Sequence, residues 1–139
     1  MAWYGDYWAR HERLLDSGLL VLVRGARIDP GTGFIGVYFD ANESDLLRSS
    51  ADREFELHLT VGYASDYCVG VAEDCVDRIN HRWRGRLVRL KVSWIGGGGS
   101  IQLAHDDLFV RDPDISWMHR RGWYGNGINC LPRQLHVSL

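Results

Sequence analysis

The stretch EFELHLTVGY, residues 54–63, decides the fold because apolar and polar residues alternate along it. Successive side chains of a β-strand point to opposite faces, so this alternation predicts a strand with one buried face. The apolar face would consist of Phe55, Leu57, Leu59 and Val61, and the opposite face of Glu56, His58, Thr60 and Gly62. The strand would therefore carry a histidine and a threonine on its polar face.

The C-terminal stretch QLHVSL, residues 134–139, repeats this pattern. One face would consist of Leu135, Val137 and Leu139, and the other of Gln134, His136 and Ser138. The order of a leucine, a histidine, an aliphatic residue and a hydroxyl residue is the same in both stretches. We expect the chain to end on a second half-buried strand.

Hydrophobic periodicity in the rest of the chain predicts an α+β fold with an antiparallel sheet and flanking helices. Helices are expected over residues 3–16 and 65–80, the second with Ser65 as its N-cap, and a short helix or turn over residues 43–50. Strands are expected over residues 19–23 and 34–39 as a hairpin, and over residues 86–95, 101–104 and 108–110. Residues 112–129 lack a clear period and are expected to form irregular surface structure.

Length and composition predict a single domain over residues 1–139. The hydrophobic content of 45% and charged content of 24% are ordinary for a globular protein. Asp6, Arg10 and Arg13 interrupt the apolar N-terminus, which argues against a signal peptide and a membrane span. We therefore expect a soluble, cytoplasmic protein without a membrane partner.

Net charge and cysteine usage narrow the partners and the compartment. A formal net charge of -2 gives no general attraction to nucleic acid, so a small nucleotide or oligonucleotide is a better candidate ligand than duplex DNA. Cys68, Cys75 and Cys130 have no paired CxxC spacing, which favours core thiols in a reducing compartment over disulfides or a zinc site. The oligomeric state is left open by these features.

A run of glycines occupies residues 96–99, between two of the expected strands. The run favours a flexible hairpin loop, with an engineered linker as the alternative. Because no Lys-Ser or Lys-Thr pair follows, the run does not predict a phosphate-binding P-loop.

The two histidine-containing stretches carry the chemistry that we expect. If their strands lie near each other, His58, Thr60, His136 and Ser138 converge on one open surface. Histidine can act as a general base or a general acid near neutral pH, and hydroxyl groups can hold the charged oxygens of a phosphodiester. The pattern predicts hydrolysis without a metal or other cofactor, although it does not say which histidine is the base.

The motifs His58-Leu59-Thr60 and His136-Val137-Ser138 resemble those of the two-histidine (2H) phosphoesterase superfamily. The resemblance also covers the separation of the motifs and the helix expected after the first one. It implies an α+β fold of two pseudo-symmetric lobes whose motifs face each other across a cleft. It further implies activity on 2′,3′-cyclic phosphates, 2′-5′ linkages or cyclic nucleotides. In its small size the chain resembles compact viral and phage members of the superfamily, and such a member would act in the host cytoplasm.

Flat rings and arginines are candidates for binding a nucleotide substrate, because rings stack on bases and guanidinium groups bind phosphate. The candidates are Tyr63, Trp117, Arg120, Arg121, Trp123 and Tyr124. The alternative to an enzyme is a nonenzymatic module that binds a nucleotide or protein through an aromatic loop over residues 117–124. A third candidate is a metal site at His105, Asp106 and Asp107 with His81 or His119, although none of the usual ligand spacings is present.

Overall fold

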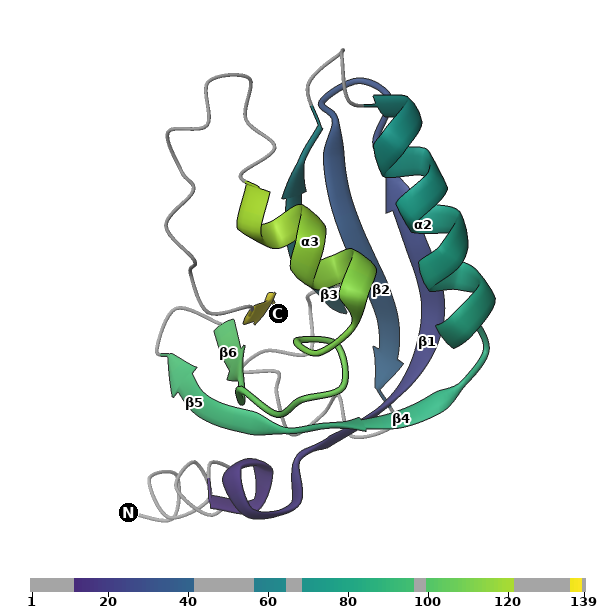
Figure 1. Cartoon of the computed structure of the whole chain (residues 1–139). Helices are drawn as coiled ribbons and strands as arrows, with labels where there is room; N and C mark the ends of the chain where they lie inside the picture. Colours follow the sequence, from purple (N-terminus) through teal and green to yellow (C-terminus); the bar gives the residue numbers. More distant parts are fainter. Residues whose placement is uncertain (1–11, 42–56, 65–68, 97–99, 122–135, 139) are drawn as a thin grey trace.

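The computed structural model describes residues 12–41, 57–64, 69–96, 100–121 and 136–138 (Figure 1). These residues form a seven-stranded antiparallel sheet with helices on one face, and residues 12–17 are helical ahead of the sheet. The strands are β1 (Leu19–Ile28), β2 (Phe34–Ala41), β3 (Leu57–Tyr63), β4 (Leu87–Leu90), β5 (Val92–Gly96), β6 (Ser100–Leu103) and β7 (His136–Ser138). The helices are α2 (Val69–Trp83) and α3 (Pro113–Arg121). The expected α+β class with an antiparallel sheet is confirmed.

The sheet curls so that its two edges are joined along the chain. Its strand order is β4-β1-β2-β3-β7-β6-β5, so β4 and β5 lie at opposite edges although only Lys91 separates them in sequence. The single strand predicted over residues 86–95 is therefore wrong. The buried carboxylate of Asp107 accepts a hydrogen bond of 2.7 Å from the Lys91 amide at the junction, and it accepts another of 2.9 Å from the Phe109 amide.

Both helices cover the same face of the sheet (Figure 1). Helix α2 packs on β1, α3 packs on β3, and the two helices contact each other. The expected apolar face of β3 is buried at Leu57, Leu59 and Val61, and the predicted stripe of α2 is buried at Ala72, Cys75, Val76 and Ile79. The prediction is wrong for Val71, which was expected in the same stripe but is exposed. Burial of alternate strand residues leaves the intervening residues on the face opposite the helices.

Side-chain hydrogen bonds fix α2 to an irregular point of β1. The pairing of β1 with β2 shifts between Val23 and Gly25, which interrupts the regular ladder. Asn80 on α2 accepts from the Ala26 amide at 2.6 Å and donates to the Ala26 carbonyl at 2.9 Å. The amide side chain thus satisfies both backbone polar groups of one residue beside the bulge.

Helix α3 corrects the expectation of irregular structure after residue 112. The Asp112 carboxylate accepts hydrogen bonds of 3.0 Å from the amides of Asp114 and Ile115, and Pro113 occupies the first helical position. This is a favourable helix start, and the fully buried Ile115 and Met118 supply the apolar face. The strand predicted over residues 108–110 is also wrong, because these residues form turns.

The other predicted elements agree with the structure where it describes them. The hairpin of β1 and β2 is confirmed with longer strands, and β5 pairs with β6 across the glycine run. Helix α2 ends three residues later than predicted, at Trp83. Several predicted features lie outside the described residues, namely most of the N-terminal helix, residues 43–50 and 97–99, Ser65, Cys68 and Cys130. No helix within the described ranges is long and apolar enough to cross a membrane.

Candidate active site

The two motif strands are direct neighbours at the centre of the sheet. In the antiparallel ladder of β3 and β7, His58 lies opposite Ser138, and Leu59 lies opposite Val137. Extending this register by one residue puts Thr60 level with His136. Residues opposite each other in an antiparallel pair share a face, as do alternate residues along one strand. The four motif positions therefore form a compact rectangle on the face that the helices leave uncovered.

The histidine positions occupy diagonally opposite corners of this rectangle, and the hydroxyl positions occupy the other two corners. Directly opposite positions in an antiparallel pair are about 5 Å apart, and diagonal positions are about 7–8 Å apart. His58 and Thr60 are half-buried, between the buried Leu57, Leu59 and Val61. A tetrahedral group at the centre could be approached by a histidine from two opposite sides.

Aromatic rings from β2 and β3 flank His58. Tyr38 lies opposite His58 in the ladder with ring centroids 5.8 Å apart, and the Phe34 ring is also 5.8 Å from the His58 ring in an edge-on arrangement. Phe34 lies opposite Tyr63, and these rings meet edge-on at 5.3 Å. The guanidinium carbon of Arg27 on β1 lies 3.7 Å from the Tyr38 ring centroid. We call Arg27, Phe34, Tyr38 and Tyr63 the aromatic-arginine cluster.

Gly36 allows the rings of β2 to lie close to the sheet. It is opposite Thr60 on one side and Arg27 on the other. A Cβ atom at this position would lie 3.0 Å from a carbon of the Phe34 ring and 3.2 Å from two carbons of the Tyr38 ring. A side chain at this position would therefore require one or both rings to shift by a few tenths of an ångström.

The β6 side of the rectangle has different residue types. Gln102 lies opposite His136, and Ser100 lies opposite Ser138. The next pair along the same row joins Gln102 to Trp94 on β5. The candidate site is thus bordered by aromatic and cationic groups on the β2 side and by small or neutral polar residues on β6.

The structure brings together some of the predicted binding residues and separates others. Tyr63 belongs to the aromatic-arginine cluster. Residues 117–121 form part of α3, so the predicted aromatic loop is wrong for that part, and Trp117 packs against the core. Arg120 and Arg121 are the last residues of α3, in the helical layer. Trp123 and Tyr124 lie outside the described residues.

Three residues of the cluster were not singled out from the sequence, namely Arg27, Phe34 and Tyr38. A signal was present, because Phe34, Gly36 and Tyr38 alternate with the buried Ile35, Val37 and Phe39. This alternation puts an aromatic residue, a glycine and another aromatic residue on one face of the strand. The alternation does not reveal that β2 pairs with β3, or that the register of this pair sets Tyr38 beside His58.

The acidic residues considered as metal ligands have structural roles. Asp106 accepts a hydrogen bond of 2.8 Å from Lys91 Nζ, which lowers the pKa of its carboxyl group. Burial raises the pKa of Asp107, against hydrogen bonds from the Lys91 and Phe109 amides that lower it. His119 Nδ1 donates to the Val61 carbonyl at 3.2 Å. Among the described residues, no group of three or more metal-ligating side chains is assembled.

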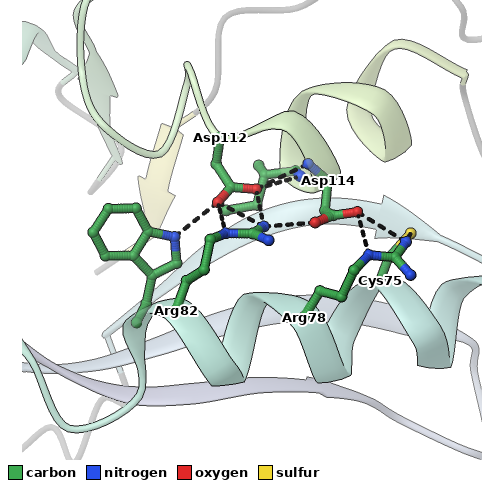
Figure 2. Close-up of polar contacts among 7 residues, drawn as sticks. Cys75, Arg78, Arg82, Asp112 and Asp114 are labelled. Carbon is green, nitrogen blue, oxygen red and sulfur yellow. Dashed lines mark hydrogen bonds and ion pairs between the residues drawn. The ribbon is translucent and has the colours of Figure 1, made fainter.

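A polar network joins α2 to α3, the helix that packs on β3 (Figure 2). Arg82 Nε and a terminal nitrogen each donate to the Asp112 carboxylate at 2.9 Å, and Arg82 also donates to Asp114 at 2.6 Å. Trp83 Nε1 donates to Asp112 at 2.8 Å, and Arg78 donates to Asp114 at 3.0 Å. The network holds α3 against α2, and thereby behind the strand that carries His58.

Titration in this network follows its contacts. Burial tends to raise the pKa of Asp114, but hydrogen bonds from Arg78 and Arg82 outweigh it, so the pKa is lowered. Burial, followed by the negative charge of Asp114, raises the pKa of the Cys75 thiol. The ionised carboxylate and the neutral thiol are therefore the favoured forms near neutral pH.

Comparison of the chain with protein-family models, with curated proteins and with solved structures returned no match. Function is therefore inferred from the residues and their geometry.

Proposed function

We propose that the protein is a metal-independent phosphodiesterase that hydrolyses a cyclic or 2′-5′ nucleotide phosphodiester. The observation that carries the proposal is the register of β3 and β7, in which His58 lies opposite Ser138. Two copies of a short motif, far apart in sequence, are adjacent and antiparallel at the centre of the sheet. This adjacency was the condition for the two motifs to form one site.

The diagonal arrangement of the histidine positions suits hydrolysis of a phosphodiester. Displacement at phosphorus brings the attacking oxygen in and takes the leaving oxygen out on roughly opposite sides. One histidine removes the proton from the attacking oxygen, and the other donates a proton to the leaving oxygen. Thr60 and Ser138, at the other corners, donate hydrogen bonds to the nonbridging oxygens, whose charge needs stabilisation during the reaction.

We also propose that the sheet divides into the two lobes that the 2H resemblance implies. In our proposal the boundary between lobes runs between β3 and β7, with β1, β2 and β3 on one side and β5, β6 and β7 on the other. Rigid strands on both sides of the boundary would hold the catalytic groups more accurately than loops could.

The test is turnover of 2′,3′-cyclic mononucleotides, 2′-5′ oligonucleotides, and cyclic di- and trinucleotides, with EDTA present. Wild type should cleave one of these classes, and His58→Ala and His136→Ala should each lower kcat/KM about a thousandfold or more. His81→Ala and His105→Ala are matched controls, because both histidines are exposed and lie outside β3 and β7, in α2 and in a turn. Both variants should behave like wild type.

Two outcomes would contradict the proposal. Turnover by wild type in a parallel assay without EDTA, together with its loss when EDTA is present, would point to metal-dependent hydrolysis. Nucleotide binding that survives in His58→Ala, without turnover by wild type, would favour the nonenzymatic binding module.

A further inference from the structure

We propose that the aromatic-arginine cluster is a nucleotide subsite that binds a base and a second phosphate beside the scissile bond. The inference rests on the proposed function, because it takes the scissile phosphate to lie between His58 and His136. The substrate would then carry at least one phosphate besides the one that is cleaved.

The cluster lies on the face that does not pack against the helices. The core residues of β2 are Ile35, Val37 and Phe39, whereas Phe34 and Tyr38 alternate with them. Phe34, Tyr38, His58 and Tyr63 are all half-buried, so their rings contact one another while keeping part of their surface in solvent. A partly exposed group of rings next to a phosphate-cleaving site is suited to stacking on a nucleobase.

Arg27 adds a cation to this surface. It is exposed, and its guanidinium lies over the Tyr38 ring. Stacking of this kind uses the flat face of the guanidinium and orients its N–H donors, which lie in the plane of the group. Those donors match the oxygens of a phosphate group in pairs.

The position of Arg27 indicates a phosphate other than the scissile one. Its guanidinium lies over Tyr38 on β2, whereas the scissile phosphate would lie between β3 and β7. Neighbouring strands are about 4.8 Å apart, so these two places are separated by about 7 Å in the plane of the sheet. That separation exceeds a hydrogen-bond length of about 3 Å, so a second phosphate is the better partner.

The residues around the rectangle also indicate which side of the substrate is recognised. The β2 side carries rings and a cation, whereas β6 carries Gln102 and Ser100 opposite the β7 positions. The nucleotide on the His58 side of the scissile bond would therefore supply most of the binding energy and the requirement for an additional phosphate.

The experiment measures binding of the four nucleoside 3′,5′-bisphosphates and the four unmodified nucleosides by titration calorimetry. The proteins are wild type, Arg27→Gln, Tyr38→Leu and the control Arg111→Gln, which removes the same charge from an exposed turn. Arg27→Gln should weaken bisphosphate binding about tenfold to a hundredfold and leave nucleoside binding unchanged. Tyr38→Leu should weaken binding of both ligand types, and Arg111→Gln should match wild type.

The subsite is refuted if wild type binds no bisphosphate, if Arg27→Gln binds the bisphosphates as tightly as wild type, or if Arg111→Gln shows an equal loss. Because binding requires no turnover, this result is separate from the catalytic test. Binding as expected with no cleavage of any substrate would support the subsite and refute the phosphodiesterase. Cleavage of a substrate by wild type, with bisphosphate binding unchanged in Arg27→Gln, would support the phosphodiesterase and refute the subsite.

Discussion

Replacement of Asp112 by alanine should destabilise the protein more than any other removal of a single charge in the network of Figure 2. The Asp112 side chain is 1% exposed, and it accepts from Arg82 and Trp83 while capping α3. Loss of a helix cap costs about 1 kcal/mol, and loss of hydrogen bonds to a charged group costs about 1.5–3 kcal/mol. An unsatisfied Trp83 N–H adds roughly 1 kcal/mol.

Together these effects should lower the free energy of unfolding by about 4 kcal/mol, a large share of the roughly 5–15 kcal/mol typical of a domain. We do not expect the larger loss of stability that follows when a fully buried ion pair is broken, because the Arg82 side chain is 32% exposed and keeps its contact with Asp114. For a chain of this length the midpoint of thermal unfolding should fall by roughly 12–20 °C.

The assay is denaturant unfolding of wild type, Asp112→Ala, Asp112→Asn and the control Asp77→Asn, an exposed carboxylate on α2. Asp112→Asn keeps one oxygen that can cap the helix, so it should lose about half as much stability as Asp112→Ala. Asp77→Asn should stay within about 0.5 kcal/mol of wild type. If Asp112→Ala unfolds within about 1 kcal/mol of wild type, the network does not hold α3 against α2.

The remaining prediction concerns two carboxylates whose effects on stability should change with pH in opposite directions. The pKa of Asp114 is lowered, so its stabilising effect is present above the ordinary carboxyl pKa of about 4 and is lost as pH falls through the lowered value. The pKa of Asp107 is raised, so its contribution is greatest below about pH 4 and is lost as pH rises through the raised value. The stability advantage of wild type over Asp114→Asn should therefore shrink between about pH 6 and pH 3, and the advantage over Asp107→Asn should grow over the same interval. Unfolding curves at several pH values measure both advantages, and parallel changes would contradict the assignment.

Local alternation was enough to predict the strands that carry the candidate site. The strands around His58 and His136, the β1–β2 hairpin and the buried stripe of α2 all depend on residues near one another in sequence, which is why periodicity revealed them. The pairing of β3 with β7 joins segments that are far apart in sequence, so no local pattern predicts it. From the sequence, the convergence of the two motifs could be expected only if their strands were neighbours.

The errors in the fold have identifiable physical causes. The break at Lys91 depends on the Asp107 carboxylate, 16 residues away in sequence, and no local pattern marks it. Helix α3 was missed because arginine, glycine and aromatic residues around it obscured a short apolar spacing. Its start was readable, since Asp112-Pro113 is a favourable cap and first residue.

The candidate site was only half visible in the sequence for the same reason. The motif residues could be identified by their pattern, but the aromatic-arginine cluster depends on which strands pair and in which register. The sequence indicated Trp117 as a candidate for binding a base, but this residue packs against the core. The rings that lie beside His58 come instead from the first hairpin.

The most direct test of the central claim is kcat/KM for His58→Ala, His136→Ala and the double variant, on whichever substrate wild type cleaves. If the two histidines act as one acid-base pair, each single variant should lose about a thousandfold or more, and the double variant should lose little beyond that. If the losses multiply in the double variant, or if one single variant keeps wild-type activity, the two motifs do not form one catalytic site.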